Sequence, residues 1–446
     1  MAETKALERA YEWITDDEGQ MCEEIPKDAC TSVPRNFFLN ALNGAATKLA
    51  DQLVSPGLVL TWFLDALNVP TTVIGFLSPV RQAGSLLPQL IVSGQIRRFP
   101  IRKWFWLAGG AIFGLVFLLM VPVSMITTGL GTGIAIVLLL AVGSLARGIS
   151  SVAFKDVLAK TIPKGRRGTL LAFRATAGGS LALIAGLILR NQVADVQEIG
   201  PYLFLIGLGG VLWLVGAALI TLIEEEPGAT EGVRSFLGEA RAGVRLLKDV
   251  PGYRSYVVVR AILLTVELSL PYYTLIVRGL TNGSVGELGI FVVAASFSEV
   301  LSSPVWGRFA DRSSRQVMGT SALIAVLAGL LVLGSEVFLG GRIHPFLMTI
   351  PLMMIGFARA GVQLGRKTYL VDGAPKEDRP TYVALANTII GILTILGSGL
   401  GWFADVFGVE ILIACLMGAA LVGSLLAFRL PPPTEMSHGI PRTPNR

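Results

Sequence analysis

Charged side chains embedded in long apolar segments are the residues of this sequence that could do chemistry. A charge in hydrocarbon is costly, so such residues normally face a cavity, have partners, and mark substrate or ion pathways. Seven lie near the middle of an apolar segment and are the candidate substrate and coupling residues: Lys48, Asp51, Arg81, Arg147, Glu267, Glu299 and Arg359. Their net charge of +1 leans towards anionic or zwitterionic cargo.

Asp51 and Glu267 are candidates for carrying a proton. Lys48 lies one helical turn before Asp51, and an ion pair at this spacing could neutralise both charges, in which case the pair would only pack its helix. Glu267 has no basic neighbour at helical spacing except Arg260, two turns before it. A desolvated carboxylate without a local partner can take up and release a proton, so Glu267 is the better candidate.

Arg147 and Arg359 are candidates for binding an anion. A guanidinium can bind a carboxylate or phosphate through two parallel hydrogen bonds, so two arginines at one cavity could clamp an anionic substrate. The alternative is that they pair with Glu267, Glu299 or Asp51 across the cavity.

Charges nearer the ends of the apolar segments have other interpretations. Arg174 and Arg260 are close enough to a segment end to extend towards the lipid headgroups, so we interpret them as residues with a structural role or in contact with headgroups. The residues at the inner segment ends are interpreted as gate or interface residues: Lys155, Asp156, Arg366 and Lys367.

The composition is that of an integral membrane protein. Hydrophobic residues make up 52% of the 446 residues and charged residues 15%, whereas about a quarter of a soluble protein is charged. The polar first 35 residues do not have the pattern of a signal peptide. The chain has two histidines and no Cys/His cluster, so we expect no metal and no cofactor.

Twelve apolar segments are long enough to cross a bilayer, which takes roughly 20 residues of helix. They lie at 37–64, 70–94, 104–126, 132–156, 168–190, 200–223, 254–277, 285–306, 317–338, 345–370, 381–402 and 407–429. Lys and Arg are concentrated in alternate loops, which predicts that both termini are cytoplasmic. The same bias explains the basic surplus without nucleic-acid binding.

The loop at 224–252 divides the segments six and six. We expect an acidic cytoplasmic tail (1–36), a first six-helix bundle (37–223), a linker with an amphipathic helix (224–252), a second bundle (253–430) and a C-terminal tail (431–446). The acidic tail is expected to be disordered, with some local helix. The alternative is an amphipathic helix, beginning with Leu7, Tyr11, Trp13 and Ile14, that docks on the inner gate.

An internal repeat supports this division. Residues 147–172 and 359–384 align without a gap at an offset of 212, with eight identities in 26 positions. Arg147 matches Arg359 and Lys155 matches Lys367. The alignment places the fourth apolar segment on the tenth and the fifth on the eleventh.

A short charged turn joins the eighth and ninth segments, at 307–315. Its sequence resembles the Gly-x-x-x-Asp-Arg-x-x-Arg signature of the major facilitator superfamily, with the gate residues Gly307, Asp311, Arg312 and Arg315. Gly94 mirrors Gly307 in the first half, but Arg98 stands where the first copy of the signature would have its Asp. The resemblance implies a strong cytoplasmic latch only in the second half.

The resemblance also implies an all-α membrane fold of twelve transmembrane helices in two pseudo-symmetric six-helix bundles, which rock about a central cavity. The first helix of each bundle, with Asp51 or Glu267, would line that cavity. Arg147 partly resembles the arginine of the fourth-helix motif of proton-coupled exporters. Ser150 and Ser151 replace the Gln and Gly of that motif.

We therefore expect a secondary active transporter of a small organic solute, with proton-coupled export of a drug or metabolite, by antiport, preferred over import and facilitated uniport left open. The expected partners are the solute, membrane lipids and protons, without nucleic acid, for a monomer in the plasma (bacterial inner) membrane. Two alternatives remain: a lipid or lysolipid translocator on the same fold, and a membrane sensor or scaffold that does not transport. No HExxH, G-x-S-x-G or Walker sequence occurs, so no enzyme is expected.

Overall fold

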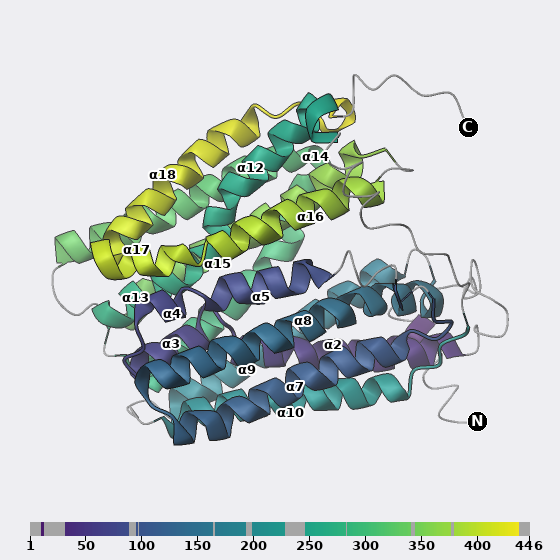
Figure 1. Cartoon of the computed structure of the whole chain (residues 1–446), viewed down its shortest axis with the longest axis horizontal. Coiled ribbons are helices and arrows are strands. Elements are labelled where there is room, and N and C mark those ends of the chain that lie inside the picture. The colour runs from purple at the N-terminus through teal and green to yellow at the C-terminus, as the bar shows by residue number, and fades with distance from the viewer. Residues whose placement is uncertain are drawn as a thin grey trace.

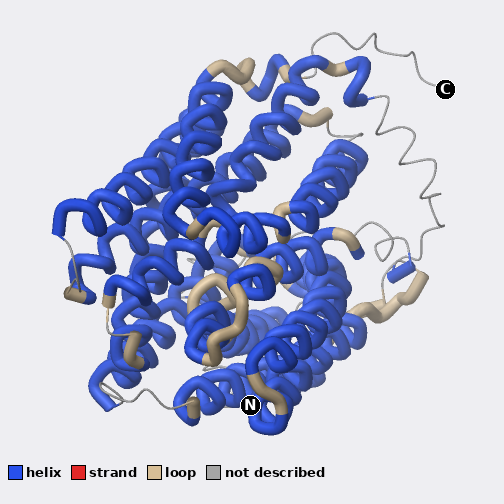
Figure 2. Tube along the Cα trace, turned by 60° about the vertical axis from the view of Figure 1, so that its left-hand side comes forward, coloured by secondary structure: helices blue, strands red, loops and turns tan. Residues whose placement is uncertain are grey.

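The computed structural model describes residues 10–12, 32–88, 95–96, 98–163, 166–192, 199–227, 246–281, 283–339, 344–375 and 379–436. The described part of the chain is built from helices and loops, without strands (Figure 2). The predicted amphipathic helix of the linker, Gly94 and most of the acidic tail lie outside the described residues.

Each of the twelve predicted apolar segments falls on helix. In the first half these helices are α2 (Val33–Leu53), α3 (Val59–Ala66), α4 (Thr71–Ile74), α5 (Leu77–Leu86), α7 (Lys103–Ile126), α8 (Gly129–Thr161), α9 (Arg167–Gln192) and α10 (Gly200–Thr221). In the second half they are α12 (Pro251–Leu268), α13 (Leu270–Leu280), α14 (Val285–Leu339), α15 (Pro345–Gly373), α16 (Arg379–Leu396), α17 (Gly399–Phe407) and α18 (Val409–Phe428).

Several segments are broken within the membrane-spanning length. The first runs through α2 and α3, which are separated at Pro56, and the second runs through α4 and α5. Nine helices among the described residues are long and apolar enough to span a bilayer. The first two apolar segments are not among these nine, because each is broken into two short helices. The single helix α14 contains two segments. Nine helices, two broken segments and the second segment of α14 together agree with twelve spans.

The signature turn lies inside α14. Ser313 has an extended backbone (φ −164°, ψ 101°) and separates the two parts of this element. Trp306 and Ser321, on either side of the break, both lie against Gly361 of α15. The two parts therefore run back along each other, and the predicted antiparallel neighbours are confirmed.

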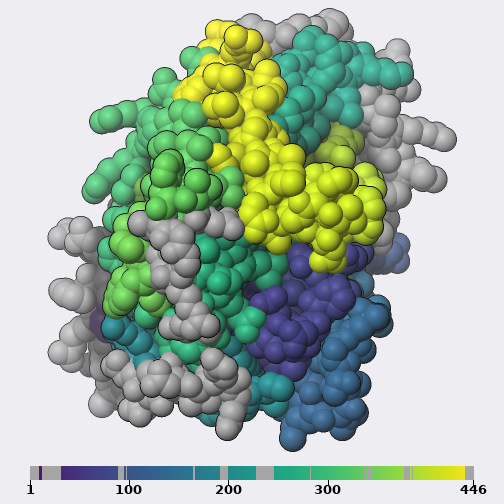
Figure 3. Space-filling model, turned by 90° about the vertical axis from the view of Figure 1, so that its left-hand side faces the viewer, coloured from purple at the N-terminus to yellow at the C-terminus, as the bar shows by residue number. Residues whose placement is uncertain are grey.

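The helices form two bundles that lie one above the other in Figure 1. Helices up to α10 make the lower bundle and those from α12 to α18 the upper one. The start of α2 and the end of α18 lie at the same end of the molecule, which we call the terminal end. At the opposite end, α17 lies directly against the α3–α4 region (Figure 3).

This opposite end, which we call the latched end, joins the two bundles through specific contacts. Arg278 of α13 forms an ion pair with Asp65 of α3. The Asp405 carboxylate of α17 accepts hydrogen bonds from the backbone N–H groups of Thr71 (3.0 Å) and Thr72 (2.6 Å) at the start of α4. An acidic group is favourable there because a helix begins with unpaired N–H groups and a partial positive charge.

Glycines allow the close approach at the latched end. A Cβ on Gly75 would lie 2.6 Å from the Cα of Gly401 on α17, and a Cβ on Gly401 would lie 2.6 Å from the carbonyl oxygen of Thr71. Neither position can carry a side chain without moving the bundles apart.

Part of the acidic tail packs on the first bundle. Tyr11 is fully buried, in a cluster with residues of α2, α8 and α9, and its ring meets that of Phe37 edge to face at 5.3 Å between centroids. Residues 10–12 are helical, in line with the expected local helix. Tyr11 fits the alternative of a docked segment, because an aromatic ring loses contact with water when it packs here.

Candidate functional site

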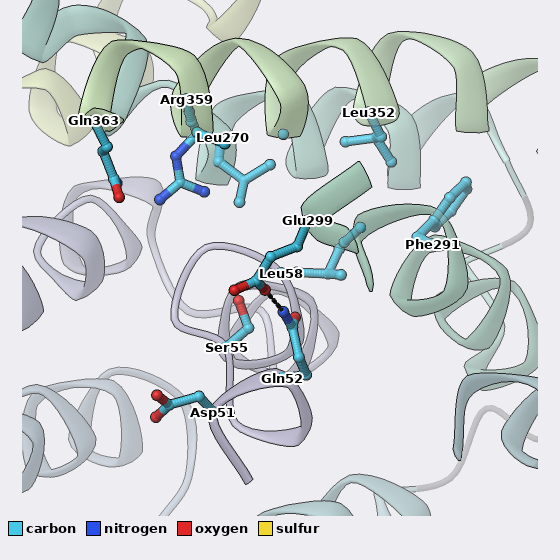
Figure 4. Close-up of a pocket in the computed structure, with 13 residues that line it drawn as sticks. Asp51, Gln52, Ser55, Leu58, Leu270, Phe291, Glu299, Leu352, Arg359 and Gln363 are labelled. Carbon is cyan, nitrogen blue, oxygen red and sulfur yellow. Dashed lines mark hydrogen bonds between the residues drawn. The ribbon is translucent and has the colours of Figure 1, made fainter. Parts of the chain in front are cut away.

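A cavity of about 260 Å³ lies between the two bundles (Figure 4). Four elements line it: α2 and the break that follows it, α13, the first part of α14, and α15. The lining residues are Asp51, Gln52, Ser55, Leu58, Leu270, Phe291, Ala295, Glu299, Leu352, Gly356, Arg359, Ala360 and Gln363. Three of the seven predicted mid-segment charges, Asp51, Glu299 and Arg359, are therefore part of the cavity wall.

Asp51 is held by two arginines of its own bundle. Arg147 of α8 donates to both carboxylate oxygens, at 2.5 and 2.6 Å, and Arg81 of α5 donates to one of them at 3.4 Å. The Arg147 guanidinium also lies over the ring of Trp213, at 4.8 Å from its centroid, and both arginines lie over Phe113. Asp51 is thus a neutralised, structurally fixed carboxylate.

This arrangement corrects one expectation and selects one alternative. The proposed local pair between Lys48 and Asp51 does not form a hydrogen bond; the contacts of Asp51 come from other helices instead. For Arg147 the structure agrees with the alternative that the arginine pairs with a carboxylate, here Asp51. Its guanidinium is therefore not available to bind a substrate in this conformation.

Lys48 instead reaches the other bundle. Its ammonium group lies 2.8 Å from the carboxylate of Glu299 on α14, and the Gln52 side chain donates to the second oxygen of the same carboxylate (Figure 4 shows this bond). Both charged side chains are about half-exposed, at 43% and 40%. A half-exposed ion pair is weak, so this bridge between the bundles can open and close at little cost.

Arg359 is the cavity charge that forms no ion pair or hydrogen bond with a described residue; Glu267 and Glu299 interact with it only at longer range. Its side chain extends from α15 towards the cavity (Figure 4). Its Nε is buried and unpaired. Since Lys48 neutralises Glu299, and Arg147 and Arg81 neutralise Asp51, the uncommitted charge of the cavity wall is positive.

Glu267 is not the isolated carboxylate that its helix suggested. Arg366 of α15 lies 3.2 Å from it, and both side chains are largely buried. The sequence predicted that Arg366 is a gate or interface residue. The spacing of charged residues along α12 carries no information about a partner from another helix, so this ion pair was not predicted. Glu267 does not line the cavity of this conformation.

Of the two interpretations of Arg174 and Arg260, the structure fits a structural role and not contact with lipid headgroups. Arg174 donates to the backbone carbonyl of Asn40 at 2.9 Å and to the Asn43 side chain at 3.2 Å. Arg260 is only 5% exposed and donates to the Asn387 side chain at 2.8 Å. Both arginines instead join helices inside one bundle.

The predicted gate residues lie at the terminal end. Asp311 and Arg312 are exposed, and Arg315 donates to the backbone carbonyl of Leu430, at 2.7 Å, after the end of α18. Gly307 has open space around it. Hydrogen bonds and ion pairs join the two bundles at the cavity and at the latched end. We call the side of the cavity that faces the terminal end the mouth.

Several residues of the site were not found from the sequence. Asp65, Arg278 and Asp405 form the latches, and Gln52 donates a hydrogen bond to Glu299. Asp65 and Asp405 occur at the ends of apolar segments on the side with few charges, and that position is the one sequence signal that could have identified them.

Comparisons with known proteins agree with this architecture. The sequence model of the Major Facilitator Superfamily matches residues 261–444. An uncharacterized protein of Mycobacterium tuberculosis is 24% identical over 407 residues, which are 90% of this chain and 78% of that protein. The magnetosome protein MamZ of Paramagnetospirillum magneticum is 30% identical over 129 residues, 28% of this chain and 18% of its own.

Solved structures extend the likeness to nearly the whole chain. A mutant of the nucleoside transporter NupG superposes with a TM-score of 0.70 at 11% identity, covering 89% of this chain and 99% of that one. A D-xylose-proton symporter gives 0.67 at 13% identity, covering 90% and 98%. A POT family transporter in complex with 5-aminolevulinic acid gives 0.69 at 12% identity, covering 89% and 96%. Likeness at such identities shows the fold.

Proposed function

We propose that this chain is a member of the Major Facilitator Superfamily and a secondary transporter of a small organic anion; the sequence match at 261–444 and the similarity of its fold to solved transporters support the proposal. The two bundles, residues 37–223 and 253–430, would act as two domains that expose the central cavity to alternate sides of the membrane. With both termini in the cytoplasm, the mouth would face the cytoplasm and the latched end the outside.

The observation that carries this proposal is the state of Arg359. A guanidinium that lines a cavity without a carboxylate partner is a binding site for a carboxylate or a phosphate group, which it can hold through two hydrogen bonds. Gln52, Ser55 and Gln363 in the same wall can hydrogen-bond the rest of a polar solute. The apolar side chains of Leu270 and Phe291 can pack against its carbon skeleton.

Glu299 is the carboxylate best placed to couple this binding to a proton. It lines the same cavity and is half-exposed, and its partner Lys48 comes from the other bundle. When Glu299 takes up a proton, Lys48 loses its partner and can bind the anion. Proton and anion would then share the cavity and leave together, which fits proton-coupled export of an anion down its own gradient.

Thermal unfolding of the purified protein with a panel of carboxylates, phosphates and neutral solutes tests the substrate class. A ligand that binds only the folded state raises the midpoint in proportion to ln(1 + [L]/Kd). We expect stabilisation by anions, its loss in Arg359→Gln, and partial retention in Arg359→Lys. Stabilisation by neutral solutes, or by lysolipids alone, would overturn the proposal.

Transport in vesicles tests the coupling. In Glu299→Gln, uptake of the anion identified above should no longer depend on the pH gradient, while exchange of internal for external anion continues. Glu267→Gln is the matched control, because Glu267 is buried outside the cavity beside Arg366. A pH-gradient dependence that survives in Glu299→Gln and disappears in Glu267→Gln would assign the coupling to Glu267.

A further inference from the structure

An apolar groove of about 510 Å³ lies on the second bundle, away from the central cavity. It runs between α12 and the pair α16 and α17, which are neighbours in the upper bundle (Figure 1). The residues that line it fall within 261–268 of α12 and within 393–403, around the break between α16 and α17. A space of this size can hold a ligand, since small-molecule pockets are typically about 300–1,000 Å³.

The chemistry of the groove does not suit a polar solute. The described residues that line it are all uncharged. The Thr265 hydroxyl already donates to the Ile262 carbonyl of its own helix, at 2.8 Å. An anion would lose its hydration here and gain no cationic partner, which is unfavourable. The groove is therefore separate from the anion pathway proposed above and fits an apolar ligand.

The groove opens towards the lipid. Its walls belong to two candidate membrane spans, Pro251–Leu280 and Leu385–Phe407. Leu396 and Trp402, which line it, are 69% and 58% exposed although both are apolar. Gly399 also lines it, and a Cβ placed on Gly399 would meet no atom within 4 Å, so the protein does not fill this space itself.

A single acyl chain suits this groove better than a helix does. The walls touch where Gly397 meets Leu268, because a Cβ on Gly397 would lie 2.5 Å from the Leu268 Cδ1 atom. A helix from a second copy of the chain is about 10 Å across and would meet only the rim of such a groove. A row of methylene groups can enter it, and lipid acyl chains surround the protein at this depth of the bilayer.

The groove lies at the breaks of two spans. One break separates α12, which ends at Leu268, from α13, which begins at Leu270. The other separates α16, which ends at Leu396, from α17, which begins at Gly399. Residues at the ends of helices can absorb the changes of backbone angle that a hinge requires. A ligand in the groove would therefore lie against two candidate hinges.

The half-helices beyond both breaks carry latch residues. Arg278 of α13 forms an ion pair with Asp65, and Asp405 of α17 accepts hydrogen bonds from the N–H groups of Thr71 and Thr72. Opening of the latched end must move α13 and α17 relative to the first bundle. A ligand that lies against both breaks thus contacts the elements whose movement opens this end.

We propose that the groove binds one acyl chain of a membrane lipid, from the half of the bilayer nearest the latched end, and that the bound chain favours the latched conformation. Lipid tails are as apolar as the groove, so the gain comes from van der Waals packing and depends on shape. The groove has this shape while the latches are formed. A chain that fits it binds this conformation better and shifts the equilibrium towards it.

Photo-cross-linking in nanodiscs tests the binding without a transport substrate. The nanodiscs contain palmitoyl-oleoyl phosphatidylcholine with a trace of phosphatidylcholine that carries a diazirine in one acyl chain, and mass spectrometry locates the cross-links. We expect about five times more cross-links per exposed residue in the groove than on the exposed side of α18. Cross-links spread evenly over both surfaces, or their absence from the groove because a second copy covers it, would overturn the proposal.

Gly399→Phe is the variant that fills the groove. Because Gly399 faces open space, the new ring can occupy the groove without displacing other residues. Gly418→Phe on α18 is the matched control, since Gly418 also faces open space but does not line the groove. Gly399→Phe should lose the excess of cross-links in the groove, and Gly418→Phe should keep it. Equal cross-linking of the two variants would contradict the site.

Spin labels at the latched end test the effect on the conformation. Leu130→Cys near the start of α8 and Phe407→Cys at the end of α17 place one label on each bundle, both at exposed positions. The native cysteines are replaced by Ser, and pulsed electron paramagnetic resonance measures the distance between the labels. The protein is compared in palmitoyl-oleoyl and in diphytanoyl phosphatidylcholine, whose methyl-branched chains are thicker and should fit the groove less well.

The branched lipid should lower the ratio of latched to open forms about threefold in the parent and in Gly418→Phe. In Gly399→Phe the ratio should not depend on the lipid, because the ring has replaced the chain. A fall of equal size in all three proteins would mean that the whole bilayer causes it, and would overturn the effect of the groove on the latch. The absence of any fall in the parent would overturn it as well.

Discussion

Arg147 and Arg359 occupy equivalent positions in the two bundles, yet their surroundings are opposite. Arg147 is fixed by a bidentate bond to Asp51 and by the ring of Trp213, whereas Arg359 faces the cavity without a partner among the described residues. Both copies of the repeat have an arginine at this position, but the residues that surround it differ between the two bundles. The comparison teaches that one bundle uses its arginine to hold helices together, whereas the other leaves its arginine at the cavity wall without an ion pair to a described residue.

Removal of the Asp51 carboxylate should release Arg147 from its ion pair, and of the changes considered it has the largest expected effect on the free energy of unfolding. In Asp51→Asn, Arg147 and Arg81 remain buried without a counter-charge, which costs about 3 to 5 kcal/mol of unfolding free energy. The midpoint of thermal unfolding in detergent measures the change. The double variant Asp51→Asn/Arg147→Met should recover part of the loss, and a single variant as stable as the parent would contradict the clamp.

The bridge between the bundles has an intermediate expected effect. A double-mutant cycle on Lys48→Met and Glu299→Gln should give an interaction energy of about 0.5 to 1 kcal/mol, because the pair is half-exposed. Chemical denaturation of each variant measures it. An interaction energy several times larger would mean that the bridge is a rigid structural pair like that of Asp51, and would argue against a role for Glu299 in coupling.

Removal of the Arg359 charge should have the smallest effect on stability. Arg359→Leu removes a partly buried cation that forms no ion pair with a described residue, so the unfolding free energy should stay within about 0.5 kcal/mol of the parent or rise. Arg147→Leu, the matched control at the equivalent position, should lose several kcal/mol by leaving Asp51 without Arg147. Equal losses in the two variants would show that the two arginines play the same structural role.

The fold was largely predictable because its signals are local. Apolar length, the positive charges of alternate loops, the signature at 307–315 and the repeat at an offset of 212 each depend on residues close in sequence. The bilayer forces each long apolar segment into a helix, because the backbone has no water to bond with. The site was predictable at the level of residue types, since Asp51, Glu299 and Arg359 do line the cavity.

Which charges form ion pairs with one another was not predictable from local sequence signals. Helical spacing suggested Lys48 as the partner of Asp51 and left Glu267 almost alone. In the structure Lys48 binds Glu299, Asp51 binds Arg147, and Glu267 binds Arg366. Each of these partners comes from another helix, at a separation of roughly a hundred residues or more, and local spacing carries no information about such contacts.

The sequence by itself determined that this chain crosses a membrane many times, that its two halves are related, and that a small set of charges lies within the spans. Those conclusions follow from the cost of placing polar groups in hydrocarbon, which acts on each segment separately. Only the tertiary structure decided which charges neutralise one another, that Arg359 remains uncommitted, and which end of the molecule is latched. An ion pair forms between groups a few ångströms apart, and helix packing sets those distances.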